Sequence, residues 1–390
     1  MAQGKQDIAR FIGRNLQVAR TFHGLTLSDL GDKVGSSHTS IANYESGARQ
    51  PGVDVLDALC ASLKFERQFF FTPLKVAFNE ELFNFRKRLT TPLYVRNKAI
   101  AHGVLFVSLI EFFDSVLDLP TYNVPEVRCT VLDESERAAQ IEKAAETCRF
   151  RWALGDRPVS SVTDVLENAG IVVTRLNIQE DEVGYVDAFS HATDRGIIVV
   201  NAVKGASRTI FDLGHELGHL VMHGGMVTGT KPTEDEANQF ASAFLLPRVA
   251  MFREFPRPHA GRIDWDAMLA FKHRWRVSLQ ATLRRARDLH LIDAATYLKA
   301  TKYISYRGWL KSEPGESPVE LPGLISSSFD VLKQEQAQNA ADIATQLHWY
   351  SDIISMVAGV DVSEPPTSRT VAKQPLGQLR FLKLEASRRS

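Results

Sequence analysis

The chain has 390 residues, of which 44% are hydrophobic and 24% are charged, with 46 basic and 46 acidic side chains. This length predicts two or three domains, because a domain usually takes about 100 to 200 residues. The balanced charge excludes a surface that binds polyanions throughout, although a local cluster of basic donors is enough to bind DNA phosphates.

The cysteines and the apolar stretches indicate which cellular compartment the protein occupies. Cys60, Cys129 and Cys148 lack the paired spacing of a zinc ribbon or a disulfide framework, which favours a reducing compartment. The N-terminus lacks the apolar core of a signal peptide, and acidic residues interrupt the most apolar stretch, 104–119. We therefore expect a cytoplasmic protein without a membrane span, in which this stretch is a buried amphipathic helix.

The first third of the chain shows helical patterns alone. Between residues 8 and 71 these patterns are short, are separated by polar breaks and end at Thr72-Pro73. They predict a compact all-helical domain within residues 1–75. Longer helical patterns follow, and we interpret residues 76–133 as a helical connector.

The domain that we expect at residues 134–312 mixes helices with strands. It begins with a helix at 134–152, and later Gly170 ends a short helix and a strand follows. The runs 185–189 and 197–200 flank a turn-like segment, which predicts a β-hairpin. The sequence thus predicts a multidomain, mainly α chain with an α+β domain behind an all-α N-terminal domain.

Two further helices are predicted in this domain, at 208–223 and 234–246, and Pro247 stops the second. The tail, residues 313–390, is rich in Pro, Ser and Glu at its start and then has one helical pattern at 329–357. We expect a helical tail there, and its sequence indicates no role.

The segment 214–219 reads GHELGH and places an HExxH pattern on the first of these two helices. His215 and His219 are four residues apart, so both imidazoles project from one face and can bind one metal ion. Glu216 lies beside them, where a carboxylate can take a proton from a water molecule at the metal. Catalytic zinc typically has three protein ligands and one position for water, which predicts a further ligand nearby.

We expect this third ligand on the second helix. The buried stripe of that helix is predicted from its apolar residues, and Glu234 lies nearer to the stripe than Glu236. Asn238 follows Glu234 by one helical turn and is placed to orient a ligand by a hydrogen bond. We predict that Glu234 is the third ligand, with Glu236 as the alternative.

One more histidine leaves an alternative open. His223 follows His219 by four residues and competes as a ligand if the helix continues that far. The glycine pair 224–225 predicts that the helix ends there, which favours a polar contact behind a ligand for His223.

At this point two motifs resemble one known family. RTIFDLGHELGHLVMH at 208–223 and EDEANQFASAFLLP at 234–247 are similar to the ImmA/IrrE family of metallopeptidases, over roughly residues 134–257. The resemblance implies a gluzincin-like zincin fold, with a small sheet beside the active-site helix, and an activity that cleaves a repressor protein to release transcription. It implies zinc as the metal and these site residues: His215, His219 and Glu234 as ligands, and Glu216 as general base.

The hairpin suggests how an extended substrate binds. The run 197–200 is expected at the edge of the sheet, where a peptide can pair as an added strand. Tyr185 is a candidate for stabilising the oxyanion, although packing within the strand is the simpler interpretation.

The N-terminal domain also resembles a known family. Residues 26–35 read as a capped helix and turn, and residues 36–47 read as a second helix with a glycine stop. This pattern is similar to the lambda-repressor-like, or XRE, helix-turn-helix over about residues 8–71. The match depends on five residues in the family's order: Ile41, Tyr44, Glu45, Gly47 and Pro51.

By this resemblance the second helix enters the major groove of a double-stranded DNA operator. We predict His38, Thr39 and Asn43 as readers of bases. Contacts to phosphates are predicted for three others: Arg14, Gln17 and Arg49. The modest charge of the domain favours a homodimer on a two-part site, while a helical bundle for protein contacts alone is the alternative.

Together these features predict a DNA-bound transcription regulator whose zinc-dependent endopeptidase cleaves a helix-turn-helix repressor or the chain itself. Two other functions stay open. One is a non-proteolytic transcription factor that uses the zincin-like domain as a ligand sensor, and the other is an antitoxin-like autorepressor. Glu216 favours the enzyme, because a purely structural metal site has no need for it.

Overall fold

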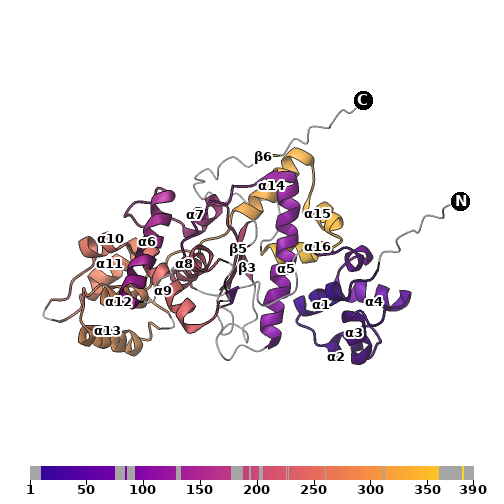
Figure 1. Cartoon of the computed structure of the whole chain (residues 1–390), viewed down its shortest axis with the longest axis horizontal. Coiled ribbons are helices and arrows are strands. Elements are labelled where there is room, and N and C mark those ends of the chain that lie inside the picture. Colours follow the sequence, from indigo (N-terminus) through magenta and orange to yellow (C-terminus); the bar gives the residue numbers. More distant parts are fainter. Residues whose placement is uncertain are drawn as a thin grey trace. The chain divides into compact units, whose positions relative to one another are not determined.

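The computed structural model describes residues 10–74, 84–85, 93–128, 133–176, 188–192, 195–201, 205–224, 226, 228–259, 261–310, 312–359 and 380–381. These residues are mainly helical, with a small sheet in one part of the chain (Figure 1). An all-α N-terminal domain and a later α+β domain confirm the fold class predicted from the sequence.

The described residues gather into two compact units. Unit 1 takes its residues from 1–82, 88–119 and 325–390, and unit 2 takes its residues from 83–87 and 120–324. The chain therefore leaves unit 1, forms unit 2 and returns to unit 1. This arrangement differs from the four consecutive segments expected from the sequence, because residues 313–324 belong to unit 2 and the helices after them belong to unit 1.

Unit 1 begins with the all-helical domain expected at its N-terminus. Thr26 and Asp29 form a reciprocal capping box at the start of the second helix, and Ser37 caps the third. The domain buries apolar side chains such as Leu16, Leu30 and Ile41. Its helical elements are α1 (Gly13–Phe22), α2 (Leu27–Lys33), α3 (His38–Glu45), α4 (Val53–Leu63) and the 3-10 helix η1 (Arg67–Phe71).

The long helix α5 (Leu93–Val116) is the apolar stretch of the sequence analysis, extended toward the N-terminus. By length and composition it could cross a membrane, but 67% of its most apolar window is buried inside the structure, as in a core helix. Within unit 1 it packs against α1, and His102 donates from Nε2 to the carbonyl oxygen of Met356 at 3.2 Å. Its last residues lead into β2 (Leu117–Asp118), which pairs with β6 (Arg380–Phe381).

The C-terminal tail completes unit 1. The single helical pattern expected at 329–357 is in fact divided, because Ala337 and His348 adopt left-handed backbone conformations with φ of 54° and 61°. Trp349 is 2% exposed and its ring lies 6.4 Å from that of Phe65 at the end of α4. The tail helices are α14 (Leu324–Gln336), α15 (Ala340–Leu347) and α16 (Ser351–Ala358).

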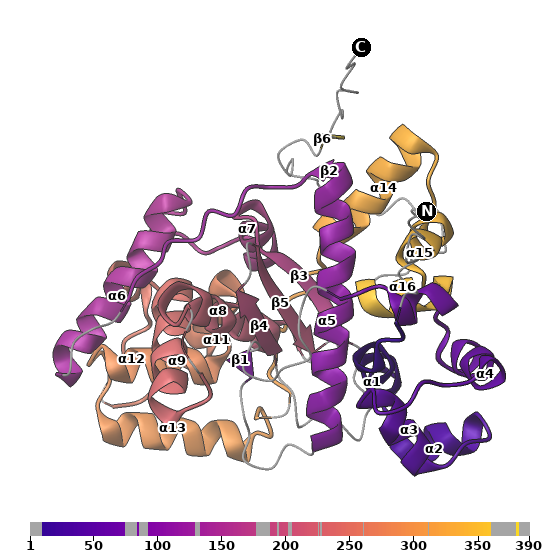
Figure 2. The same ribbon diagram turned by 45° about the vertical axis from the view of Figure 1, so that its right-hand side comes forward.

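Unit 2 contains a four-stranded sheet in the order β1-β4-β5-β3 (Figure 2). Its strands are β1 (Asn84–Phe85), β3 (Val172–Leu176), β4 (Ala188–Ala192) and β5 (Gly196–Asn201). β4 and β5 pair antiparallel, which confirms the predicted hairpin in its described part, while β3 and β5 pair in parallel.

One expectation about this sheet is wrong. The run Ile197–Val200 lies in β5, which is paired on both sides and so cannot accept an added strand. Its six residues are all buried, as is typical of an inner strand. The sequence pattern misled because buried inner strands and half-buried edge strands are both rich in apolar residues. Tyr185 lies outside the described residues.

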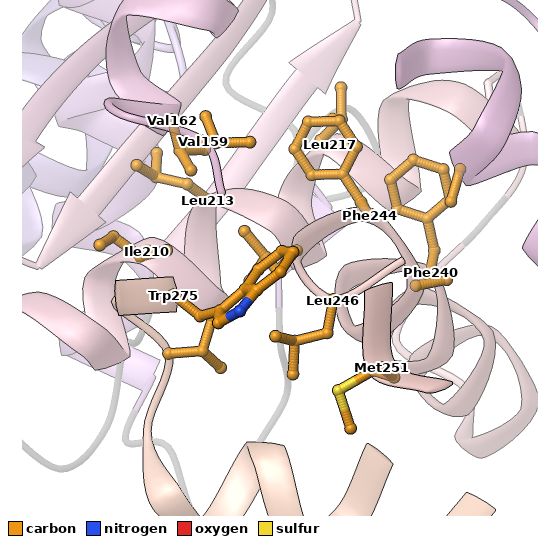
Figure 3. Close-up of a cluster of buried hydrophobic side chains, with 14 of the residues drawn as sticks. Val159, Val162, Ile210, Leu213, Leu217, Phe240, Phe244, Leu246, Met251 and Trp275 are labelled. Atoms are coloured by element: carbon orange, nitrogen blue, oxygen red, sulfur yellow. The ribbon is translucent and has the colours of Figure 1, made fainter. Parts of the chain in front are cut away.

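Helices cover this sheet and form the main core of unit 2. Of these, α8 packs against both β4 and β5 and against α9. The helices are α6 (Glu134–Arg151), α7 (Val162–Asn168), α8 (Ala206–Met222), α9 (Lys231–Leu245), α10 (Arg248–Glu254), α11 (Trp265–Trp275), α12 (Leu279–Asp288) and α13 (Ala294–Tyr306). Figure 3 shows part of the core, with Val159, Val162, Ile210, Leu213, Leu217, Phe240, Phe244, Leu246, Met251 and Trp275 labelled.

The linker expected after residue 312 accepts hydrogen bonds from the N-termini of three helices. We call residues 313–320 the glutamate strap. Glu313, Glu316 and Glu320 each accept a hydrogen bond from a backbone N–H in the first turn of a helix, where N–H groups have no partner within the helix. The donors are Leu279 of α12 at 2.9 Å, Ser207 of α8 at 3.0 Å and Thr163 of α7 at 2.8 Å.

A buried lysine fixes the strap to the rest of unit 2. Lys272 is 2% exposed and donates to Glu313 and Glu316, each at 2.7 Å. Beyond the strap, the fully buried carboxyl group of Glu167 accepts from the backbone N–H of Gly323 and Leu324 at the start of α14. Burial raises the pKa of Glu167 to about 8. Unit 2 therefore ends at the start of α14 and includes the strap.

Replacing Glu316 tests this assignment. Glu316→Gln removes a charge that Lys272 and the start of α8 both use, so we expect the free energy of unfolding to fall by about 1–3 kcal/mol. Urea unfolding of the full chain followed by tryptophan fluorescence reports mainly on unit 2, which holds four of the five tryptophans. Glu335→Gln, on an exposed face of α14, is the control and should change stability by less than about 0.5 kcal/mol. Equal effects of the two changes would contradict the assignment.

Candidate metal centre and nucleic-acid interface

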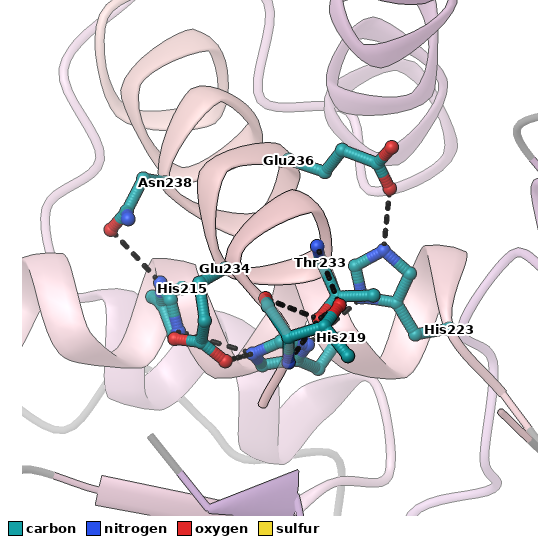
Figure 4. A network of polar contacts seen from close by, with 8 residues as sticks. His215, His219, His223, Thr233, Glu234, Glu236 and Asn238 are labelled. Atoms are coloured by element: carbon teal, nitrogen blue, oxygen red, sulfur yellow. Dashed lines mark hydrogen bonds and ion pairs between the residues drawn. The ribbon is translucent and has the colours of Figure 1, made fainter. Parts of the chain in front are cut away.

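The candidate metal centre is built where α8 crosses α9. A Cβ atom on Gly218 of α8 would lie 3.2 Å from the Cα of Ala237 and 3.1 Å from the ring of Phe240, both on α9. Only glycine therefore allows this close approach without a shift of the backbone. The crossing brings the first turn of α9, which carries Glu234, to the face of α8 that carries the histidines (Figure 4).

The two histidines and Glu234 place their ligand atoms close together. The Nε2 atoms of His215 and His219 are 3.1 Å apart. The carboxylate oxygens of Glu234 lie 3.3 Å and 3.4 Å from these two nitrogens. Both histidines are 1% exposed, and together the three residues form a group that could hold a metal ion.

The protonation states of this group suit a cation. Burial lowers the pKa of His219 to about 4, so its imidazole is neutral and keeps a lone pair for a metal. Burial alone would raise the pKa of Glu234, but the two imidazoles beside it lower that pKa to about 2. Neutral imidazoles with an ionised carboxylate are the forms that bind divalent metals.

Each histidine ligand has a polar contact on its other ring nitrogen. Nδ1 of His215 lies 3.1 Å from Oδ1 of Asn238, as the sequence predicts for a residue that orients a ligand. Nδ1 of His219 lies 2.9 Å from Nδ1 of His223. The other nitrogen of His223 lies 2.9 Å from Glu236, so the structure places the alternative ligands His223 and Glu236 behind the group rather than in it.

Glu216 lies between the two histidine ligands on α8 and is 1% exposed. This burial keeps its carboxylate in a water-poor environment. The sequence prediction of a general base at this residue is compatible with that burial.

The helix-turn-helix of unit 1 also depends on a close approach. A Cβ atom on Gly31 of α2 would lie 2.6 Å from the carbonyl oxygen of Ser36, just before α3. Arg20 of α1 holds the end of α3 by two hydrogen bonds to the carboxylate of Glu45, at 2.6 Å and 3.0 Å. The sequence pattern does not predict this partly buried ion pair, because the two residues are 25 positions apart.

The predicted DNA-contacting residues lie on α1, on α3 and in the loop after α3. His38, Thr39 and Asn43 are exposed on α3, and the carbonyl oxygen of Asn43 accepts from the backbone N–H of Arg49 at 3.1 Å. Two residues of α1 were predicted to contact phosphates: Arg14 is exposed and Gln17 is partly buried. The six residues are therefore positioned on the surface of one small domain, and their contacts to DNA stay predictions.

Comparison with known proteins supports both the helix-turn-helix and the domain that carries the candidate metal centre. The family model for a helix-turn-helix matches residues 17–70, and the model for the IrrE N-terminal-like domain, from a metallopeptidase family, matches residues 166–287. The first range runs from within α1 to within η1, and the second includes α8, α9 and all three candidate ligands. No curated protein matches the chain. The two matches confirm the fusion that the motifs indicate.

A pair of glycines on α8 tests the crossing. Gly218→Ala adds a methyl group against the backbone of α9, so we expect the unfolding free energy to fall by about 1–3 kcal/mol and metal affinity to fall with it. Gly214→Ala is the matched control, because its Cβ would meet Ala241 at an ordinary 3.4 Å. Both changes gain about 1 kcal/mol of helix propensity, so the control should be neutral or more stable. If both variants unfold and bind metal alike, the crossing does not need Gly218.

Proposed function

We propose that this chain, which joins a helix-turn-helix to an IrrE N-terminal-like domain, is a cytoplasmic DNA-binding transcription regulator with a zinc-dependent endopeptidase. Its substrate is a helix-turn-helix repressor or a segment of the chain itself. One observation carries the enzymatic part: His215, His219 and Glu234 converge from two helices with their ligand atoms 3.1–3.4 Å apart.

These separations fit zinc. Ligand atoms about 2.0–2.1 Å from zinc in a tetrahedron lie roughly 3.3–3.4 Å from one another. Both oxygens of Glu234 are buried and face the two imidazoles. Two imidazoles and one carboxylate also leave a fourth position for water or substrate, which is the ligand set of a catalytic site.

Different residues of the chain have different roles in peptide hydrolysis. Zinc held by the three ligands would polarise the scissile carbonyl and make water acidic enough to attack it near neutral pH. Glu216 takes the proton of the attacking water and delivers it to the leaving amine. Burial of Glu216 strengthens this exchange, since charges interact more strongly where water is excluded. Asn238 keeps the ring of His215 in one orientation.

The sheet offers an edge for an extended substrate beside the metal centre. β4 packs against α8 and carries β1 on its outer side, where Asn84 pairs with Ser190 and Phe85 with Phe189. This edge therefore already accepts an extended segment about 100 residues away in sequence. Among the described residues, β1 pairs with only Phe189 and Ser190 of β4, so we propose that the substrate pairs along the rest of this outer side of β4, in place of β5.

The helix-turn-helix supplies the link to transcription. α3 presents His38, Thr39 and Asn43 to the major groove, and Arg14, Gln17 and Arg49 bind phosphates on either side. A homodimer places two such helices on the two halves of an operator. This arrangement suits a protein with no excess of positive charge.

A glutamate variant tests the enzyme. Glu216→Gln should bind zinc with the stoichiometry of the wild type but cleave a helix-turn-helix repressor, or its own chain, at least about 100-fold more slowly. Cleavage is measured on gels and by mass spectrometry, and zinc by elemental analysis. Asp235→Asn, an exposed change on α9, is the control and should cleave at the wild-type rate. Cleavage by neither the wild type nor the variant would favour the ligand-sensing alternative.

A change on α3 tests the DNA-binding part. Asn43→Ala should weaken binding to a duplex that the wild type selects from a random pool by about 5- to 150-fold, because one base-reading side chain is worth about 1–3 kcal/mol. Binding to random-sequence DNA should change little, since phosphate contacts remain. Peptidase activity should also persist. Equal loss on selected and random DNA would argue against a base-reading role for Asn43.

A further inference from the structure

The two histidine ligands differ in the residue that contacts their Nδ1 nitrogen. His215 contacts the neutral amide of Asn238, whereas His219 contacts a second imidazole, that of His223. His223 is 2% exposed and in turn contacts the carboxylate of Glu236. Figure 4 shows Asn238 on the side of His215 and Glu236 on the side of His223.

The positions of the protons follow from the chemistry of these contacts. His219 can bind a metal through Nε2 only if its proton is on Nδ1. Nδ1 of His223, at 2.9 Å, must then accept this proton's hydrogen bond. The proton of a neutral His223 therefore lies on Nε2, from which it donates to Glu236 at 2.9 Å. One arrangement satisfies all three groups.

The same arrangement excludes His223 as a ligand of this metal. Both of its nitrogens are engaged, one with His219 and the other with Glu236. Its backbone N–H still donates to the carbonyl oxygen of His219 at 2.9 Å, so the two rings lie one helical turn apart at the end of α8. The ring of His223 thus joins the ligand His219 to the carboxylate of Glu236.

We propose that His223 and Glu236 are positioning residues that hold His219 in its metal-binding orientation and tautomer. This inference rests on the proposed zinc site. Glu236 lies on α9 two residues after Glu234, so the contact also ties the two ligand-bearing helices together. Arg137 of α6 lies 3.6 Å from the second oxygen of Glu236 and balances its charge.

The expected effect is on metal affinity first and on activity only as a consequence. Partners behind a metal-bound histidine typically contribute 10- to 100-fold to affinity. The carboxylate of Glu236 contacts His223. Loss of its negative charge should therefore lower metal affinity even when the shape of the Glu236 side chain is kept. Asn238 supports the other ligand separately and should be independent of this pair.

Zinc titration of the full-length apoprotein against a chromophoric chelator tests the proposal. His223→Leu should raise the Kd for zinc by about 10- to 100-fold, and Glu236→Gln should raise it less. His223→Asn keeps an acceptor at the position of Nδ1 and should recover part of the loss. Asp235→Asn, which removes a charge from the neighbouring exposed position, is the matched control and should stay within about twofold of wild type.

Two further measurements separate positioning from other roles. Thermal melting of the apoproteins shows whether the variants fold, and His223→Asn should melt within a few degrees of wild type. The visible spectrum of the cobalt-substituted protein reports the ligand set, which His223→Asn should leave unchanged, whereas His219→Ala should abolish it.

These outcomes distinguish failure of the positioning role from failure of the proposed zinc-dependent function. Wild-type zinc affinity in His223→Leu would overturn the positioning role while leaving the zinc site intact. A loss in His223→Asn as complete as that in His219→Ala would also overturn it, by making His223 a ligand. A wild-type chain that binds no zinc would overturn the proposed function and the inference together.

Discussion

The close crossing of α8 and α9 is the constraint on which the candidate centre depends. Gly218 leaves room for the backbone of α9, and the crossing places Glu234 at the two histidines. Glycine inside a helix costs roughly 1 kcal/mol of propensity. Burial of a large apolar side chain such as Phe240 at this contact contributes about 1.5–3 kcal/mol. Packing therefore outweighs propensity, and the crossing is stable although a helix-weakening residue stands at its centre.

The helix that carries the histidines is held at both ends by carboxylates from other segments. Glu316 of the strap accepts from the first turn of α8 at Ser207, and Glu236 of α9 accepts from His223, the residue just after the last residue of α8. A helix fixed in this way keeps its ligands in place before metal arrives. Burial alone would be unfavourable for the ionised carboxylate of Glu234, and the two imidazoles offset this cost. A bound metal ion would give this charge a further partner.

The local sequence pattern predicts much of the candidate site. The other features depend on contacts between segments far apart in sequence, which a local pattern does not show. The HExxH spacing predicted the two histidines on one face, and the buried stripe of the next helix selected Glu234 over Glu236. The helices begin earlier than predicted, at Ala206 and Lys231, because their caps Gly205 and Thr230 precede the apolar pattern. Pairing of β1 with β4, the inner position of β5 and the strap all join segments far apart in sequence. Periodicity cannot show such partners, since it reports which face of an element is buried and not what buries it.

The path of the chain bears on how proteolysis could control DNA binding. Unit 2 is inserted within unit 1, and the core of the N-terminal domain includes Trp349 from the far end of the chain. Backbone hydrogen bonds join residues 64–66 to 348–350 at 2.9 Å and 3.0 Å. A single cut between residues 74 and 93 would break one connection but leave these contacts and those between α1 and α5 in place. Residues 1–74 have no other peptide link to the rest of the chain, so release of the helix-turn-helix after such a cut would also require these non-covalent contacts to separate.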